Sequence, residues 1–181
     1  DQWKDFEGAK MIFHCRRAGM ILDELYLSLK RLDFQNRLNY ELFPLLDDDT
    51  LHRSSAAFED IEETRRRFLE IQVLLGKVRE QMGETDVYKS LEMTYRTLLG
   101  GYLVWWGEHS RGGAFLRSAL GWAALKDERE LELKCLQNLC YLFIQTEEGQ
   151  RFDSLAERYM HAAERCFDEP AYGAALRFKG L

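Results

Sequence analysis

The sequence has few prolines, no closely spaced cysteine pair and no long apolar run. Its two prolines are Pro44 and Pro170, and none of its four cysteines shows Cys-x-x-Cys spacing. The uninterrupted apolar stretches are only a handful of residues, too short to cross a membrane. With 46% hydrophobic and 31% charged residues, the composition instead predicts a folded, helix-rich protein with a substantial core.

The four cysteines, Cys15, Cys135, Cys140 and Cys166, all lie in helical patterns. We therefore expect reduced, buried thiols, which are typical of intracellular proteins. The cytoplasm is the expected location, with the nucleus as the alternative. The chain starts at Asp1 rather than Met and stops in LRFKGL, within a helical pattern, so we expect a fragment of a larger protein.

An excess of positive charge is also missing. The net charge is −6, which argues against a nucleic-acid surface, because neutralising phosphates requires clustered lysine and arginine. The run RRR at 65–67 directly follows EDIEET. This alternation of charge predicts a solvated helix face and no direct contact with nucleic acid.

Signals for β-strands are nearly absent, whereas helical periodicity runs through the whole chain. We predict an all-α fold, with long helices in residues 1–84 and shorter helices in residues 85–181, packed as one unit. The long helices are expected at about 3–31, then around Pro44, and then up to Gln81 with Gly83 as the stop. The shorter helices are expected at about 88–106, 110–126, 129–147, 152–166 and from 171 onward.

Residues 100–113, GGYLVWWGEHSRGG, place five glycines inside a helical pattern. A glycine in a helix interior costs about 1 kcal/mol relative to alanine, so the structure must require them. The small residues at 100 and 112 match Cys140 and Ala156 in the next pair of helices. Such residues let two helices cross closely, and Gly107 suits the turn between them.

This pattern resembles the tetratricopeptide repeat over about residues 93–166. In that family the first helix carries Leu-Gly, the turn carries a glycine, and the second helix carries small, large and small residues at spacings of four and three. The stretch NLCYLF…EG…LAERYMHAA is similar to the longer repeats of kinesin light chains and of helical sensor domains in bacterial regulators. Arg96 and Leu136 depart from the pattern, because the family usually has tryptophan or a similar residue there.

The resemblance implies antiparallel helical hairpins stacked into a right-handed superhelix, whose concave groove binds a peptide or helix of a partner protein. Only Asn138 and Lys134 fit the clamp that some members use for acidic chaperone tails, so an apolar or mixed partner segment is expected. By the family pattern, ten residues of the two first helices would line the groove: Thr94, Thr97, Gly101, Val104, Trp105, Lys134, Gln137, Tyr141, Ile144 and Gln145.

Residue types that catalyse reactions or bind metals do not occur at the necessary spacings. LLDDDTLHR has Leu51 where the aspartate-rich motif of terpene synthases needs an acid. The pairs His14–Cys15 and His161–Cys166 point about 100° and 140° apart around a helix, so neither pair suits one zinc ion. We therefore expect no enzymatic activity, no metal and no cofactor.

Two functions from different classes follow. The first is a non-enzymatic scaffold that binds a partner protein through the repeat groove. The second is a regulatory or ligand-sensing helical domain of a larger signalling or transcription-regulating protein. A structural subunit of an assembly is the third alternative.

The adjacent tryptophans are expected to have different surroundings, because neighbouring helical residues point about 100° apart. Trp106 shares a stripe with Leu99 and Leu103 and is expected to be buried between helices. Trp105 shares a stripe with Leu98 and Tyr102, at the edge of the predicted groove. There, either the N-terminal helices cover it or a partner contacts it as an aromatic anchor.

Overall fold

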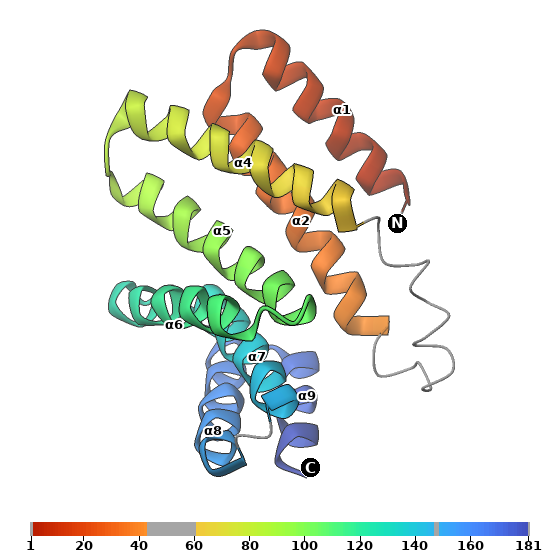
Figure 1. Cartoon of the computed structure of the whole chain (residues 1–181), viewed down its shortest axis with the longest axis vertical. Coiled ribbons are helices and arrows are strands. Elements are labelled where there is room, and N and C mark those ends of the chain that lie inside the picture. The colour runs from red at the N-terminus through yellow and green to blue at the C-terminus, as the bar shows by residue number, and fades with distance from the viewer. Residues whose placement is uncertain (1, 43–60, 147–148, 181) are drawn as a thin grey trace. The chain divides into compact units, whose positions relative to one another are not determined.

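The computed structural model describes residues 2–42, 61–146 and 149–180, and within these ranges the chain forms eight helices and no strand (Figure 1). The prediction of an all-α fold is thereby confirmed. The helices are α1 (Gln2–Ala18), α2 (Ile21–Leu42), α4 (Ile61–Met82), α5 (Asp86–Trp105), α6 (His109–Lys126), α7 (Arg129–Thr146), α8 (Gly149–Cys166) and α9 (Glu169–Lys179).

The chain divides into two compact units, Asp1–Glu92 and Met93–Leu181. The division falls inside α5, whose first turns belong to the first unit and whose remainder belongs to the second. The sequence pattern places its boundary at 84/85, eight residues before the division between Glu92 and Met93.

The expected single helix over residues 3–31 is wrong, because Gly19 ends α1 and a new helix starts at Ile21. Gly19 has φ +71°, a left-handed conformation that costs little only without a Cβ. The amide of Met20 donates to the carbonyl of Cys15 at 3.0 Å, as in a Schellman cap. The apolar periodicity continues across this cap, which is why periodicity alone missed it. The predicted disturbance at Pro44 lies outside the described residues.

In the first unit, α2 packs against both α1 and α4 (Figure 1). Leu25, Leu29 and Leu32 of α2 are buried, as are Phe68, Ile71, Leu74, Leu75 and Val78 of α4. Burial of one apolar stripe per helix is the expected source of stability for such a layer. Gly83, with φ +67°, ends α4 as predicted.

The arginine run of α4 is only partly a solvated face. Arg65 and Arg66 are exposed, in agreement with the prediction, and pair with Glu62 and Glu63 one turn earlier. Arg67, in contrast, keeps only 18% of its side chain exposed.

In the second unit, α6, α7, α8 and α9 pack consecutively, each against the next. Leu116, Leu136, Leu139 and Tyr159 are among the buried residues of a continuous apolar core. The C-terminal helix closes this core through Phe178, whose ring meets those of Tyr141, Phe152 and Tyr159 at centroid distances of 5.2, 6.0 and 5.9 Å. Aromatic pairs at such distances add to the stability gained by burial.

The five glycines of residues 100–113 each have a structural reason. Gly100 and Gly112 face each other where α5 and α6 cross, and a Cβ on Gly112 would lie 2.7 Å from the carbonyl oxygen of Gly100. Gly107 forms the turn, with φ +81°. The two glycines without an account from sequence, Gly101 and Gly113, lie against α7, next to Asn138 and Leu142 respectively.

The turns after α5 and α8 share one hydrogen-bond pattern but carry different residues at the left-handed position. In the turn after α5, the amide of Gly107 donates to the carbonyl three residues earlier at 3.0 Å, and the amide of the next residue donates to the carbonyl five residues earlier at 2.8 Å. After α8, Phe167 occupies the same position with φ +53°. The amides of Phe167 and Asp168 donate to carbonyls three and five residues earlier, both at 3.1 Å. A residue with a Cβ loses about 1–2 kcal/mol in this conformation, so Phe167 is strained.

Phe167→Gly is therefore expected to raise the free energy of unfolding by about 1 kcal/mol, or the melting temperature by about 2–4 °C. The lost ring should cost little, because Phe167 is 93% exposed. Calorimetry of the full chain measures the change, and Phe167→Ala, which keeps the Cβ, should stay near the wild type. A Phe167→Gly protein that melts below the wild type would contradict the strain argument.

Candidate partner-binding face

Three contacts join α5 to α7, and they occur in the same order along both helices. They are Thr97 with Cys135 (Oγ1 to Sγ 3.2 Å), Gly101 with Asn138 (a Cβ at 101 would lie 3.1 Å from Cγ), and Trp105 with Tyr141 (ring centroids 5.7 Å). Because the residue numbers increase together on the two helices, α5 and α7 lie side by side and run in the same direction.

This packing divides the ten groove residues predicted from sequence. Thr97, Gly101 and Val104 are buried. They cannot touch a partner while α5 remains packed on α7, so their role is to hold the two helices together. The sequence pattern placed these three residues in an open groove, and it could not show that a neighbouring helix covers this face of α5.

The other seven candidates stay accessible, two on α5 and five along one stripe of α7. Thr94 and Trp105 of α5 are half-buried. The five candidates of α7 are called the α7 strip: Lys134, Gln137, Tyr141, Ile144 and Gln145. The first three of these residues are half-buried, and the last two are exposed. Ile144 is 41% exposed. The strip therefore combines an apolar side chain, an aromatic ring and polar groups on one accessible face.

Two cationic side chains lie in or near the strip. Lys134 belongs to the strip, and the field of Arg177 from α9 reaches Tyr141, where it opposes the rise in the pKa of Tyr141 that burial causes. No carboxylate is a member of the strip.

Asn138 does not serve as a clamp for an acidic tail. It is only 3% exposed, and its Nδ2 donates to the carbonyl of Lys134 at 2.8 Å. Its amide instead fills the space left by the missing side chain of Gly101. The sequence signal that could have indicated this contact is the glycine itself, because a Cβ at this position would meet the amide of Asn138.

The expectation that Trp106 is buried between helices is wrong, because Trp106 is half-buried. α5 ends at Trp105, and the chain turns at Gly107 directly afterwards. The ring of Trp106 lies 5.6 Å from that of Tyr102, a residue of the last turn of α5. The sequence pattern extended a helical stripe to Trp106, but the helix ends one residue before it.

The thiols of the second unit are poor nucleophiles. Burial raises the pKa of Cys135 and of Cys140 to about 12, and it also raises the pKa of Cys166. Since the thiolate is the reactive form, almost none is present near neutral pH. His161 is exposed and pairs with Glu164 at 3.2 Å.

Two further features limit the kinds of site in the described ranges. Among residues 2–42, 61–146 and 149–180, no three His, Cys, Asp or Glu side chains gather closely enough to hold a metal ion. None of the helices described here is long and apolar enough to cross a membrane.

Comparison with known proteins gives no relative: the chain matches no protein-family model, no curated protein and no solved structure.

Proposed function

We propose that this chain is a non-enzymatic interaction module of the tetratricopeptide type, which binds a peptide or helix of a partner protein along Trp105 and the α7 strip. The observation that carries the proposal is the parallel, ordered contact between α5 and α7. In a stack of two-helix repeats, the first helices of successive repeats lie side by side in this way and form one continuous surface. The hairpin and superhelix arrangement is part of the same proposal.

The anchor of the face is the aromatic pair Trp105–Tyr141. Both rings are half-buried, so each is fixed by its neighbours yet keeps a side open to a partner. Partly desolvated tryptophan and tyrosine dominate the energetics of many interfaces. The partner segment is expected to place an apolar residue beside this pair and an acidic residue near Lys134.

The test is a selection of peptides from a displayed library on the full chain, followed by measurement of their dissociation constants. Trp105→Ala should weaken binding by about 2 kcal/mol, or roughly thirtyfold, while circular dichroism shows an intact helical fold. Leu125→Ala is the matched control, because Leu125 is an exposed apolar residue on α6, outside the face. Selected peptides that bind Trp105→Ala as tightly as the wild type, or that depend on Leu125 instead, would exclude the proposed face.

The free thiols Cys135 and Cys140 fit a reducing compartment. They support a location in the cytoplasm, with the nucleus as the alternative. The second candidate function, a regulatory or ligand-sensing domain of a larger protein, is favoured by a cleft in the first unit, whose wall combines apolar and charged residues of α1, α2 and α4.

A further inference from the structure

A cleft of about 240 Å³ lies among α1, α2 and α4, entirely within the unit Asp1–Glu92. One part of its wall is apolar and includes Ile12, Leu32 and Ile71, one residue from each helix. Leu32 and Ile71 also belong to the buried core, so close packing holds this part of the wall in place. The cleft therefore offers a fixed apolar surface to a small molecule.

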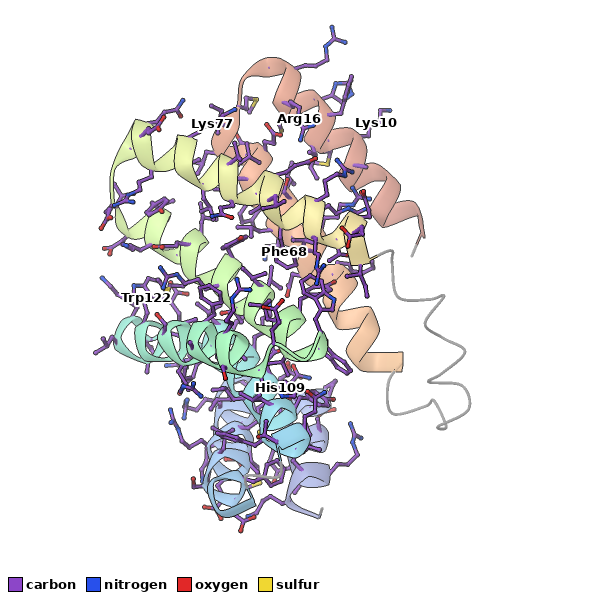
Figure 2. All side chains as sticks on the ribbon, in the orientation of Figure 1. Lys10, Arg16, Phe68, Lys77, His109 and Trp122 are labelled. Carbon is purple, nitrogen blue, oxygen red and sulfur yellow. The ribbon has the colours of Figure 1, made fainter. Side chains whose placement is uncertain are left out.

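The other part of the wall is charged, and its charges are matched. Figure 2 labels Arg16 on α1, which belongs to a chain of groups of alternating sign. Each member lies next to one of opposite charge: Glu24, Arg16, Glu70, Arg66, Glu63 and Arg67. Arg31, which also lines the cleft, is engaged in a contact of its own. Neither an anion nor a cation therefore meets an excess of opposite charge along this chain of groups.

These side chains also divide strictly into donors and acceptors. The hydrogen bond from Arg66 lowers the pKa of Glu63, and the hydrogen bond to Glu24 raises the pKa of Arg16, so both ion pairs stay charged near neutral pH. An ionised carboxylate only accepts hydrogen bonds, and a guanidinium only donates them. A ligand that binds among these groups must match both kinds.

One pair of opposite charges faces across the cleft at a longer distance than the others. Arg16 Nη2 of α1 and Glu70 Oε2 of α4 lie 3.7 Å apart, beyond the about 2.7–3.2 Å of a direct N–H···O hydrogen bond. Both residues line the cleft, and 57% of the Arg16 side chain and 42% of the Glu70 side chain are exposed. A ligand can reach both, and a group between them must accept from Arg16 and donate to Glu70.

We propose that this cleft binds a small uncharged molecule that carries a primary amide on an apolar body. The amide carbonyl accepts from Arg16, the amide NH₂ donates to Glu70, and the body lies along Ile12 and Ile71. An ionised carboxylate has no proton to donate to Glu70, and an ammonium or amidinium group has no lone pair for Arg16. An amide supplies both and adds no charge to a balanced wall.

The size of the ligand follows from the volume of the cleft. The 240 Å³ of the cleft lie below the roughly 300–1,000 Å³ of pockets for drug-sized ligands. The apolar body is therefore a single ring or a short alkyl chain. The inference rests on the ligand-sensing candidate function and names the chemical class of its ligand.

Three ligands of nearly the same shape test the charge argument: benzamide is neutral, benzoate is negative and benzamidine is positive. Each is titrated into the full chain, and binding is followed by calorimetry and by the rise in melting temperature. Benzamide should bind at least about tenfold more tightly than either charged ligand. N,N-Dimethylbenzamide, which lacks the N–H donors, and acetamide, which lacks the ring, should each bind at least about fivefold more weakly than benzamide.

Two variants give a result that a purely structural role would not produce. Glu70→Gln removes a negative charge from the wall and should shift the preference from benzamide toward benzoate. Arg16→Gln removes a positive charge and should shift the preference toward benzamidine. In both variants the ratio of affinities should change at least about tenfold. Glu80→Gln is the matched control, because Glu80 lies on α4 outside the set of lining residues, and it should leave the ratio within about twofold of the wild type.

Three results would overturn the proposal: a charged ligand that binds as tightly as benzamide, equal binding of benzamide and its dimethyl derivative, or no saturable binding of benzamide up to about 10 mM. Tight binding of a charged ligand would keep the cleft as a ligand site and exclude only the amide. Absence of binding by all five ligands would count against the ligand-sensing function as well. Trp105→Ala should leave the benzamide affinity unchanged, so the partner-binding face is tested separately.

Discussion

Gly112→Leu is expected to lower the free energy of unfolding by about 3 kcal/mol, or the melting temperature by about 6–12 °C. The first added atom, Cβ, would lie 2.7 Å from the carbonyl oxygen of Gly100 and 2.9 Å from Cγ2 of Val104. The closer neighbour is backbone, which cannot rotate away as a side chain does. α5 and α6 would have to separate, and the buried residues between them would lose contact.

Gly121→Leu is the control, on the same helix and with the same chemical change. A Cβ at Gly121 meets nothing within 4 Å, and leucine is the better helix former, so stability should be unchanged or increase by up to about 1 kcal/mol. Ala156→Leu, at a fully buried position on α8, should behave like Gly112→Leu. Equal melting temperatures for the variants at 112 and 121 would mean that α5 and α6 do not cross at these glycines.

The second large effect is expected at the contact between α5 and α7. Gly101→Ala should cost about 2 kcal/mol, because the added methyl group would collide with Oδ1 of Asn138. The amide of Asn138 is buried and held by its hydrogen bond to Lys134, so it cannot swing aside without losing that bond. Denaturant unfolding of the single variant measures this cost.

Asn138→Ala tests whether the collision with Asn138 causes the loss of stability in Gly101→Ala. Alone it should cost about 1 kcal/mol, through the lost hydrogen bond and the space left behind. In the double variant the alanine at 101 has room, so the double variant should be more stable than the two single costs predict, by about 1–2 kcal/mol. Strictly additive costs would show that residues 101 and 138 do not touch, and the parallel placement of α5 and α7 would lose one of its three supporting contacts.

Much of the helical architecture was accessible to local reasoning. The stop at Gly83 and the turn at Gly107 were predicted from glycine alone, and both residues have positive φ. The break at Gly19 has the same local signal, but the apolar stripe continued across it and concealed it. Trp106 shows the opposite error, since a stripe was extended past the end of its helix.

The sequence by itself determined that this chain forms helices and that α5 and α6 approach closely at Gly100 and Gly112, because period, turn residues and side-chain size are local properties. Only the tertiary structure decided which predicted groove residues are accessible. Thr97, Gly101 and Val104 are buried while Ile144 is exposed, and this difference depends on where α7 lies. The arginine-lined cleft is likewise a tertiary feature, since its wall comes from α1, α2 and α4, and no pattern along one helix records how three helices meet.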